Sequence, residues 1–67
     1  MRFNGTAVIW LEDDWFVATC VENNVASQGK TMDTAMENLK EALALYYEDN
    51  VVPQYGTRYI APLELAI

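Results

Sequence analysis

The chain has 67 residues, of which 52% are hydrophobic and 21% charged, a composition typical of one small globular domain covering residues 1–67. Ten acidic and four basic residues give a net charge of -6, which disfavours direct binding to nucleic acids and to anionic membranes. No apolar run approaches the roughly 20 residues that span a bilayer, and the N-terminal residues lack the features of a secretory signal, so we expect a cytoplasmic protein.

The N-terminal third of the chain predicts a β-hairpin, with strands over residues 3–11 and 15–21. Side chains alternate between the two faces of a strand, so the position of the turn decides which of them share a face. A turn at Asp13-Asp14 places six apolar side chains together by pairing Leu11 with Phe16, Ile9 with Ala18, and Ala7 with Cys20. The opposite face is mixed and carries both tryptophans, with Thr6, Val8, Trp10 and Glu12 against Trp15, Val17 and Thr19.

A third strand and a helix follow in the middle of the chain. Asn23-Asn24 favours a tight turn, because asparagine tolerates positive φ, and it precedes a short strand over residues 25–28. Thr31 is a suitable N-cap for a helix from Met32 to about Asp49. Apolar residues recur at helical spacing and predict one buried stripe, formed by Met32, Ala35, Met36, Leu39, Ala42, Leu43 and Tyr46.

Alternating apolar residues at the C-terminus predict a last strand from Tyr59 to Ile67. Pro62 lacks a backbone N–H, which favours an edge position or an interrupted strand. The predicted fold class is therefore α+β, a small two-layer β-β-β-α-β domain with a mostly antiparallel sheet and one long helix on one face.

The residue types that perform catalysis are scarce or isolated. Cys20 is the lone cysteine and the chain has no histidine, so neither Cys20 nor Ser27 has an evident base to activate it. Glu12, Asp13 and Asp14 are consecutive, which is typical of a solvated turn rather than of a metal site. We predict no catalytic, cofactor-binding or metal-binding residues, and therefore no enzyme.

Aromatic residues make up 12% of the chain, more than one thin core can hide. Trp10 and Trp15 fall on the predicted sheet face that points away from the helix, either packed on each other as a surface pair or covered by another chain. Tryptophan is a frequent interface anchor. We predict an oligomer or partner interface on this face, formed by Val8, Trp10, Trp15, Val17 and Thr19.

The run WFVATCVENNVASQGKTMDTAMENLKEALALYYED resembles the HicB-like antitoxin family over about half of the chain. That family typically has vA-x-C-P-E-L followed by ASQG-x-T-x-x-EA-x-x-NLKEAlelyle. The matching residues are Ala18, Cys20, Glu22, Val25, Ala26, Ser27, Gln28, Gly29, Thr31, Ala35, Asn38, Leu39, Lys40, Glu41, Ala42, Leu43, Leu45 and Tyr46. Three positions in turn and cap regions depart from the pattern: Val21 replaces proline, Asn23 leucine and Thr34 glutamate.

The resemblance implies a non-catalytic protein that binds and occludes a HicA-type toxin, a small basic ribonuclease that cuts messenger RNA. It also implies a homo-oligomer, a dimer or tetramer. Many family members append a DNA-binding domain for which this chain has no room, so we expect no nucleic-acid binding by this chain alone. A solitary structural or regulatory oligomer without a toxin is the main alternative. A deep pocket with convergent polar groups would instead favour a small-molecule-binding domain or an enzyme.

Overall fold

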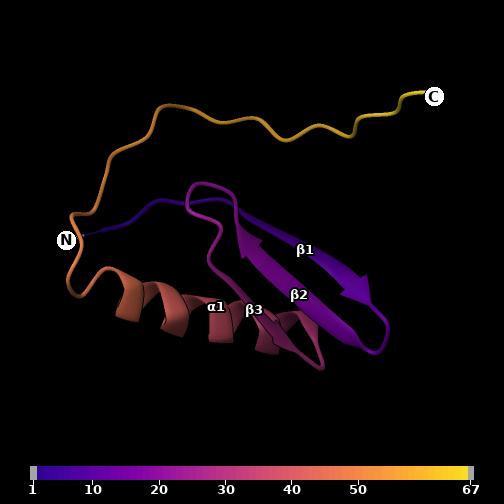
Figure 1. Cartoon of the computed structure of the whole chain (residues 1–67), viewed down its shortest axis with the longest axis horizontal. Coiled ribbons are helices and arrows are strands. Elements are labelled where there is room, and N and C mark those ends of the chain that lie inside the picture. The colour runs from indigo at the N-terminus through magenta and orange to yellow at the C-terminus, as the bar shows by residue number, and fades with distance from the viewer. Residues whose placement is uncertain (1, 67) are drawn as a thin grey trace.

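The structure, a computed structural model, describes residues 2–66 and has two layers. A three-stranded antiparallel sheet in the order β1-β2-β3 forms one layer, with β1 at Ala7–Glu12, β2 at Trp15–Cys20 and β3 at Ala26–Gly29. The helix α1, Met32–Tyr46, forms the other layer and lies on one face of the sheet (Figure 1). The predicted α+β class and the order of the first four elements are confirmed.

The predicted hairpin register is also confirmed. Ala7 lies opposite Cys20, Ile9 opposite Ala18, and Leu11 opposite Phe16. Both tight turns place a non-glycine residue in the left-handed region, Asp13 at φ 55° and Asn24 at φ 63°, conformations that Asp and Asn tolerate better than most residues.

The core lies where α1 meets β2 and β3. Its fully buried members are Ala18 and Cys20 from β2 and Ala35 and Leu39 from α1. The helix begins as predicted, because the Thr31 hydroxyl accepts a hydrogen bond from the Thr34 backbone N–H at 3.0 Å. The predicted apolar stripe of α1 faces this core in part: Met36 and Leu43 pack against it, whereas Met32 and Tyr46 are exposed.

The helix is placed off-centre on the sheet, over β3 and β2 and away from β1. Gly29, at the end of β3, allows this close approach: a Cβ there would lie 2.6 Å from the Ala35 backbone nitrogen and 2.9 Å from the Thr34 carbonyl carbon. The Asn38 side-chain amide joins the two layers by donating to the Gln28 carbonyl at 2.8 Å. Leu11, at the far end of β1, consequently remains 62% exposed.

Two predicted element boundaries differ from the structure by three residues or more, and the other boundaries of the first three strands differ by at most one residue. The helix ends at Tyr46 rather than near Asp49, because the Asn50 side chain donates to the Tyr46 carbonyl and caps the last turn. β1 begins at Ala7 rather than Phe3, because backbone groups of the preceding residues are hydrogen-bonded to side chains instead of to a neighbouring strand. The Thr6 N–H donates to Glu22, and the Asn4 carbonyl accepts from Arg58.

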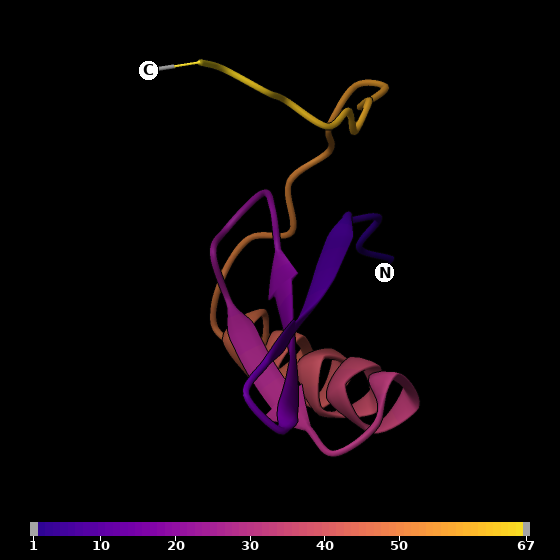
Figure 2. The same ribbon diagram turned by 90° about the vertical axis from the view of Figure 1, so that its right-hand side faces the viewer.

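The predicted last strand is wrong for the described part of this chain. Residues 59–66 are extended but belong to no sheet, and they run apart from the two-layer body (Figures 1 and 2). Ile67, the last residue of the predicted strand, lies outside the described residues. Alternation identified a segment able to form a strand, but a strand also needs a partner edge, and no edge within residues 2–66 pairs with it.

We expect Gly29→Ala to lower the free energy of unfolding by about 1–3 kcal/mol, because the added Cβ meets backbone atoms that can move only if α1 shifts. Gly56→Ala is the matched control, since a Cβ there has no neighbour within 4 Å. Urea denaturation of both variants measures the difference. Equal stabilities of the two variants would contradict the close approach at Gly29.

Candidate interaction surface

The sheet face opposite α1 holds all five predicted interface residues. Cross-strand pairing places Val8 opposite Thr19, Trp10 opposite Val17, and Glu12 opposite Trp15. We call the surface formed by Val8, Trp10, Trp15, Val17 and Thr19 the tryptophan face. No other element of residues 2–66 lies over it, and Trp10 and Trp15 are 43% and 39% exposed. The structure therefore brings the predicted residues together; their role as an interface stays a prediction.

The two indoles occupy separate environments. No ring–ring contact joins them among the described residues, so they do not form the aromatic pair considered as an alternative. The Trp10 indole Nε1 donates to a Glu12 carboxylate oxygen at 3.1 Å. The Lys30 ammonium lies 4.3 Å from the centre of the Trp15 ring, a cation–π contact. Each ring thus presents an apolar surface beside a charge, which is negative next to Trp10 and positive next to Trp15.

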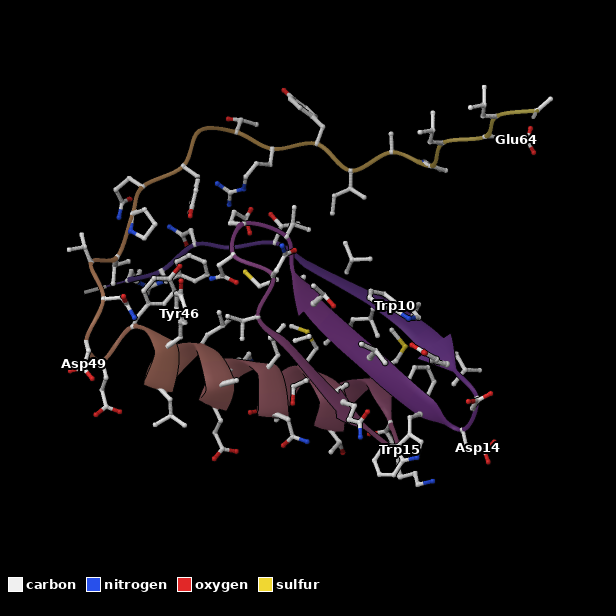
Figure 3. All side chains as sticks on the ribbon, viewed as in Figure 1. Trp10, Asp14, Trp15, Tyr46, Asp49 and Glu64 are labelled. Carbon is white, nitrogen blue, oxygen red and sulfur yellow. The ribbon has the colours of Figure 1, made fainter. Side chains whose placement is uncertain are left out.

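An acidic rim borders the tryptophan face at the β1–β2 turn, formed by Glu12, Asp13 and Asp14, all exposed. Figure 3 shows Asp14 next to Trp15 at this end of the sheet. Within residues 2–66, no three histidine, cysteine or acidic side chains are grouped so that they could hold a metal ion. Carboxylates on a turn beside exposed aromatic rings are suited to contact a positively charged protein surface.

Residues 20–25 form a structural corner. The Cys20 side chain is buried, and its thiol donates to Glu22 at 3.4 Å. Burial and the neighbouring Glu22 carboxylate raise the pKa of Cys20, which opposes formation of a reactive thiolate. Asn23 accepts from the Val25 N–H and donates to the Tyr47 hydroxyl, at 3.0 and 2.9 Å. These polar side chains connect the turn to the strand and the helix end.

The sequence did not indicate the ion pair between the buried Glu22 and the partly buried Arg58. The Glu22 side chain is only 4% exposed, and its Oε2 lies 2.7 Å from Arg58 Nε. That N–H is directed at the Thr6 hydroxyl, 3.1 Å away, so the carboxylate contact is electrostatic rather than a well-aligned hydrogen bond. Arg58 also donates to the Asn4 carbonyl at 2.8 Å. The two residues are distant in the sequence, and neither lies in a motif that would have linked them.

Glu22 remains ionised to lower pH than an ordinary glutamate. Burial alone would raise the pKa of Glu22, but hydrogen bonds from the Thr6 N–H and the Cys20 thiol outweigh it, so the pKa is lowered. The Thr6 N–H lies 2.9 Å from the carboxylate.

An open, largely apolar groove lies at the C-terminal end of α1, with a volume of about 690 Å³. Phe3 lines this groove, and the centroid of its ring is 4.8 Å from that of Tyr47 and 6.3 Å from that of Tyr55. Sequence reasoning missed this aromatic cluster, because Phe3 and Tyr55 lie near opposite ends of the chain. The lining residues are Phe3, Lys40, Leu43, Ala44, Tyr47, Asn50, Val51 and Val52. Lys40, Tyr47 and Asn50 carry polar side-chain ends, and the Tyr47 hydroxyl already accepts a hydrogen bond from Asn23, so the groove does not provide the convergent polar groups that a specific small-molecule site requires.

The fold and its surfaces define a small α+β protein with an uncovered aromatic sheet face. Residues 2–55 match the family described as Family of unknown function (DUF7387), and the chain belongs to that family. No curated protein and no solved structure gives a significant match. None of the helices within residues 2–66 has the length and apolar character needed to cross a membrane. The family description gives no activity, so the resemblance to HicB-like antitoxins stays a prediction.

We expect Glu22→Gln to lower the free energy of unfolding by about 1.5–3 kcal/mol at pH 7, because it removes the charge from a buried hydrogen-bonded carboxylate. A pKa lowered in the folded state stabilises the protein above the unfolded pKa, near 4.3, and that stabilisation is lost as the pH falls through the folded pKa. The difference between wild type and variant should therefore shrink towards pH 3, as measured by urea denaturation. A difference that stays constant with pH would contradict the assignment.

Proposed function

We propose that this chain is a non-catalytic, cytoplasmic, antitoxin-like protein that binds a small basic HicA-type ribonuclease through the tryptophan face and occludes its active surface. The observation that carries the proposal is the pair of partly exposed indoles on a sheet face that no helix or strand of the described chain covers. Tryptophans in such positions are frequent centres of protein interfaces. The resemblance of residues 15–49 to HicB-like antitoxins supports this class of partner.

Charge supports a basic partner. The acidic rim at Glu12, Asp13 and Asp14 borders the indoles, and the net charge is -6. The solvent side of α1 adds exposed carboxylates at Asp33, Glu37 and Glu41, of which only Glu37 pairs with a lysine, Lys40, at 3.5 Å. A field of this sign accelerates the encounter with a positively charged ribonuclease and opposes direct contact with RNA.

The residues that carry the resemblance act in the fold rather than in chemistry. Gly29 permits the approach of α1, Asn38 bonds the Gln28 carbonyl, and Leu39 is in the core. Cys20 carries the thiol of the matching run. Its side chain is buried and its pKa is raised, so it is not suited to act as a nucleophile. These placements support a binding role for the exposed surfaces and a structural role for the matching run.

Co-expression with a HicA-type ribonuclease tests the proposal. We expect the wild-type chain to restore growth and to co-purify with the toxin. The double substitution Trp10→Ala and Trp15→Ala should weaken binding by more than about tenfold, the usual scale for interface tryptophans. Leu45→Ala is the matched control, because Leu45 is also an exposed large apolar residue but lies on α1.

Circular dichroism should show the helix intact in all variants, since both tryptophans are partly exposed. Absence of a complex and of growth rescue by the wild type would reject the proposal. Rescue by the double variant as strong as that by wild type would reject the tryptophan face as the binding surface.

A solitary homo-oligomeric structural or regulatory module is the second candidate function. The observation that favours it is a second uncovered apolar region, in the C-terminal segment, where Leu63 is 94% exposed. A stable oligomer that buries Trp10 and Trp15 against further copies of the chain, and that binds no HicA-type toxin, would identify this function.

A further inference from the structure

The C-terminal segment after Arg58 is an apolar arm that contacts almost nothing in its own chain. We call residues 59–66 the arm. Tyr59 is 90% exposed, and Ile60, Leu63 and Leu65 are also exposed. Figure 2 shows the arm apart from the sheet and the helix. Large apolar side chains presented together on an extended segment usually mark an interaction site.

The arm has the pattern of a strand with one apolar face. Tyr59, Ala61, Leu63 and Leu65 alternate with Ile60, Pro62, Glu64 and Ala66. In an extended segment the first set lies on one face and the second set on the other. The backbone groups alternate in the same way, so the N–H and C=O of the first set point to one side and those of the second set to the other.

β1 offers an unpaired edge to such a strand. The Val21 N–H donates to the Thr6 carbonyl at 2.9 Å, and these residues are opposed in the same register as the rest of the hairpin. Alternation from this pair directs the backbone groups of Val8 and Trp10 towards β2. It directs those of Ala7, Ile9 and Leu11 outwards, and no strand of residues 2–66 pairs with that side of β1.

An apolar strip lies beside this edge on the helix face. Because α1 covers β3 and β2, Leu11 and Met32 are exposed and Ile9 and Met36 are only partly buried. A groove of about 210 Å³ continues the strip between β1 and α1, lined in part by Ala7, Met36 and Leu43. A fourth strand beside β1 would cover this strip with the side chains of its own apolar face.

Pro62 selects the direction of that strand. If the apolar face of the arm points towards the helix layer, antiparallel pairing turns the backbone groups of Ala61, Leu63 and Leu65 towards β1. Pro62, which has no N–H, then faces outwards, where no bond is lost. Parallel pairing with the same face inwards would turn Pro62 towards β1 and remove a ladder bond.

The anchor at Arg58 prevents the arm from reaching its own β1 in the antiparallel direction. Arg58 binds Glu22, Thr6 and Asn4 at the beginning of β1. The arm leaves this point in the same general direction as β1 (Figure 1), so pairing within the chain would be parallel. Antiparallel pairing requires an arm that approaches from the other end of β1, and a second copy of the chain can supply it.

We propose that the arm of one copy adds to the open edge of β1 in a second copy as an antiparallel fourth strand, and that two copies exchange arms reciprocally. Leu63 and Leu65 then cover the strip beside Leu11 and Met36 of the partner copy. This assembly uses the helix face and the edge of the sheet, so it leaves the tryptophan face accessible and does not depend on the proposed toxin binding.

Sedimentation equilibrium tests the assembly with two matched substitutions in the full chain. Leu63→Glu places a charge on the face that meets the strip and should raise the dissociation constant of the dimer more than about tenfold. Ile60→Glu makes the same kind of change on the opposite face and should have little effect. A monomeric wild type, or equal effects of the two substitutions, would overturn the proposal.

A spin label distinguishes exchange from pairing within one chain. The label is attached at Glu64→Cys on unlabelled protein, since Cys20 is buried, and this protein is mixed with a ¹⁵N-labelled wild-type chain. We expect broadening of the Ile9 and Leu11 amide signals in the ¹⁵N-labelled copy, together with slow hydrogen exchange of these amides. A second sample carries the spin label and the ¹⁵N isotope on the same chain. Broadening in this second sample alone, or in neither sample, would exclude arm exchange.

Discussion

The close approach of β3 and the first turns of α1 at Gly29 determines how the two layers of this protein meet. A side chain at this position would collide with the backbone at Thr34 and Ala35, so its absence lets the helix rest directly on the sheet. Ala18 and Ala35 also have small side chains, and both are fully buried in the core between the sheet and the helix. The helix therefore lies towards the β3 edge of the sheet, and the helix-facing surface next to the β1 edge is left without a cover. The open edge and the exposed strip beside β1 both follow from this placement.

A second constraint acts at the end of the sheet where β1 begins and β2 ends. Glu22 gathers the Thr6 N–H, the Cys20 thiol and the Arg58 guanidinium around one buried carboxylate. It thereby joins the chain before β1, the turn after β2 and the segment after the helix. A chain of 67 residues has a thin apolar core, and a buried charge that connects three separate segments contributes order that apolar packing alone would not provide.

Sequence periodicity predicted the elements that local patterns specify. The hairpin register followed from the alternation of Ala7, Ile9 and Leu11, because a shift by one residue would have exposed the whole apolar set. The helix start followed from Thr31, whose side chain bonds the first turn. The five residues of the predicted interface were correctly placed on one face, since the register fixes that face as well.

Features that depend on distant contacts could not be predicted in this way. The alternation of Leu63 and Leu65 indicates that the segment can form a strand, but not which edge it pairs with. The contact between Glu22 and Arg58, and the cluster of Phe3 with Tyr47 and Tyr55, arise only when the two ends of the chain meet. The helix end depended on Asn50, a residue beyond the last turn whose capping bond to Tyr46 has no signature in the apolar stripe.

The opposite charges beside the two indoles give the protein a built-in optical reporter. Trp10 donates to a carboxylate, whereas an ammonium group lies over the ring of Trp15, so the charges beside the two rings differ in sign. Indole emission shifts in wavelength with the field and with exposure to water. Burial of the surrounding surface would therefore change the two emission components differently, and the native tryptophans can follow association without an added dye.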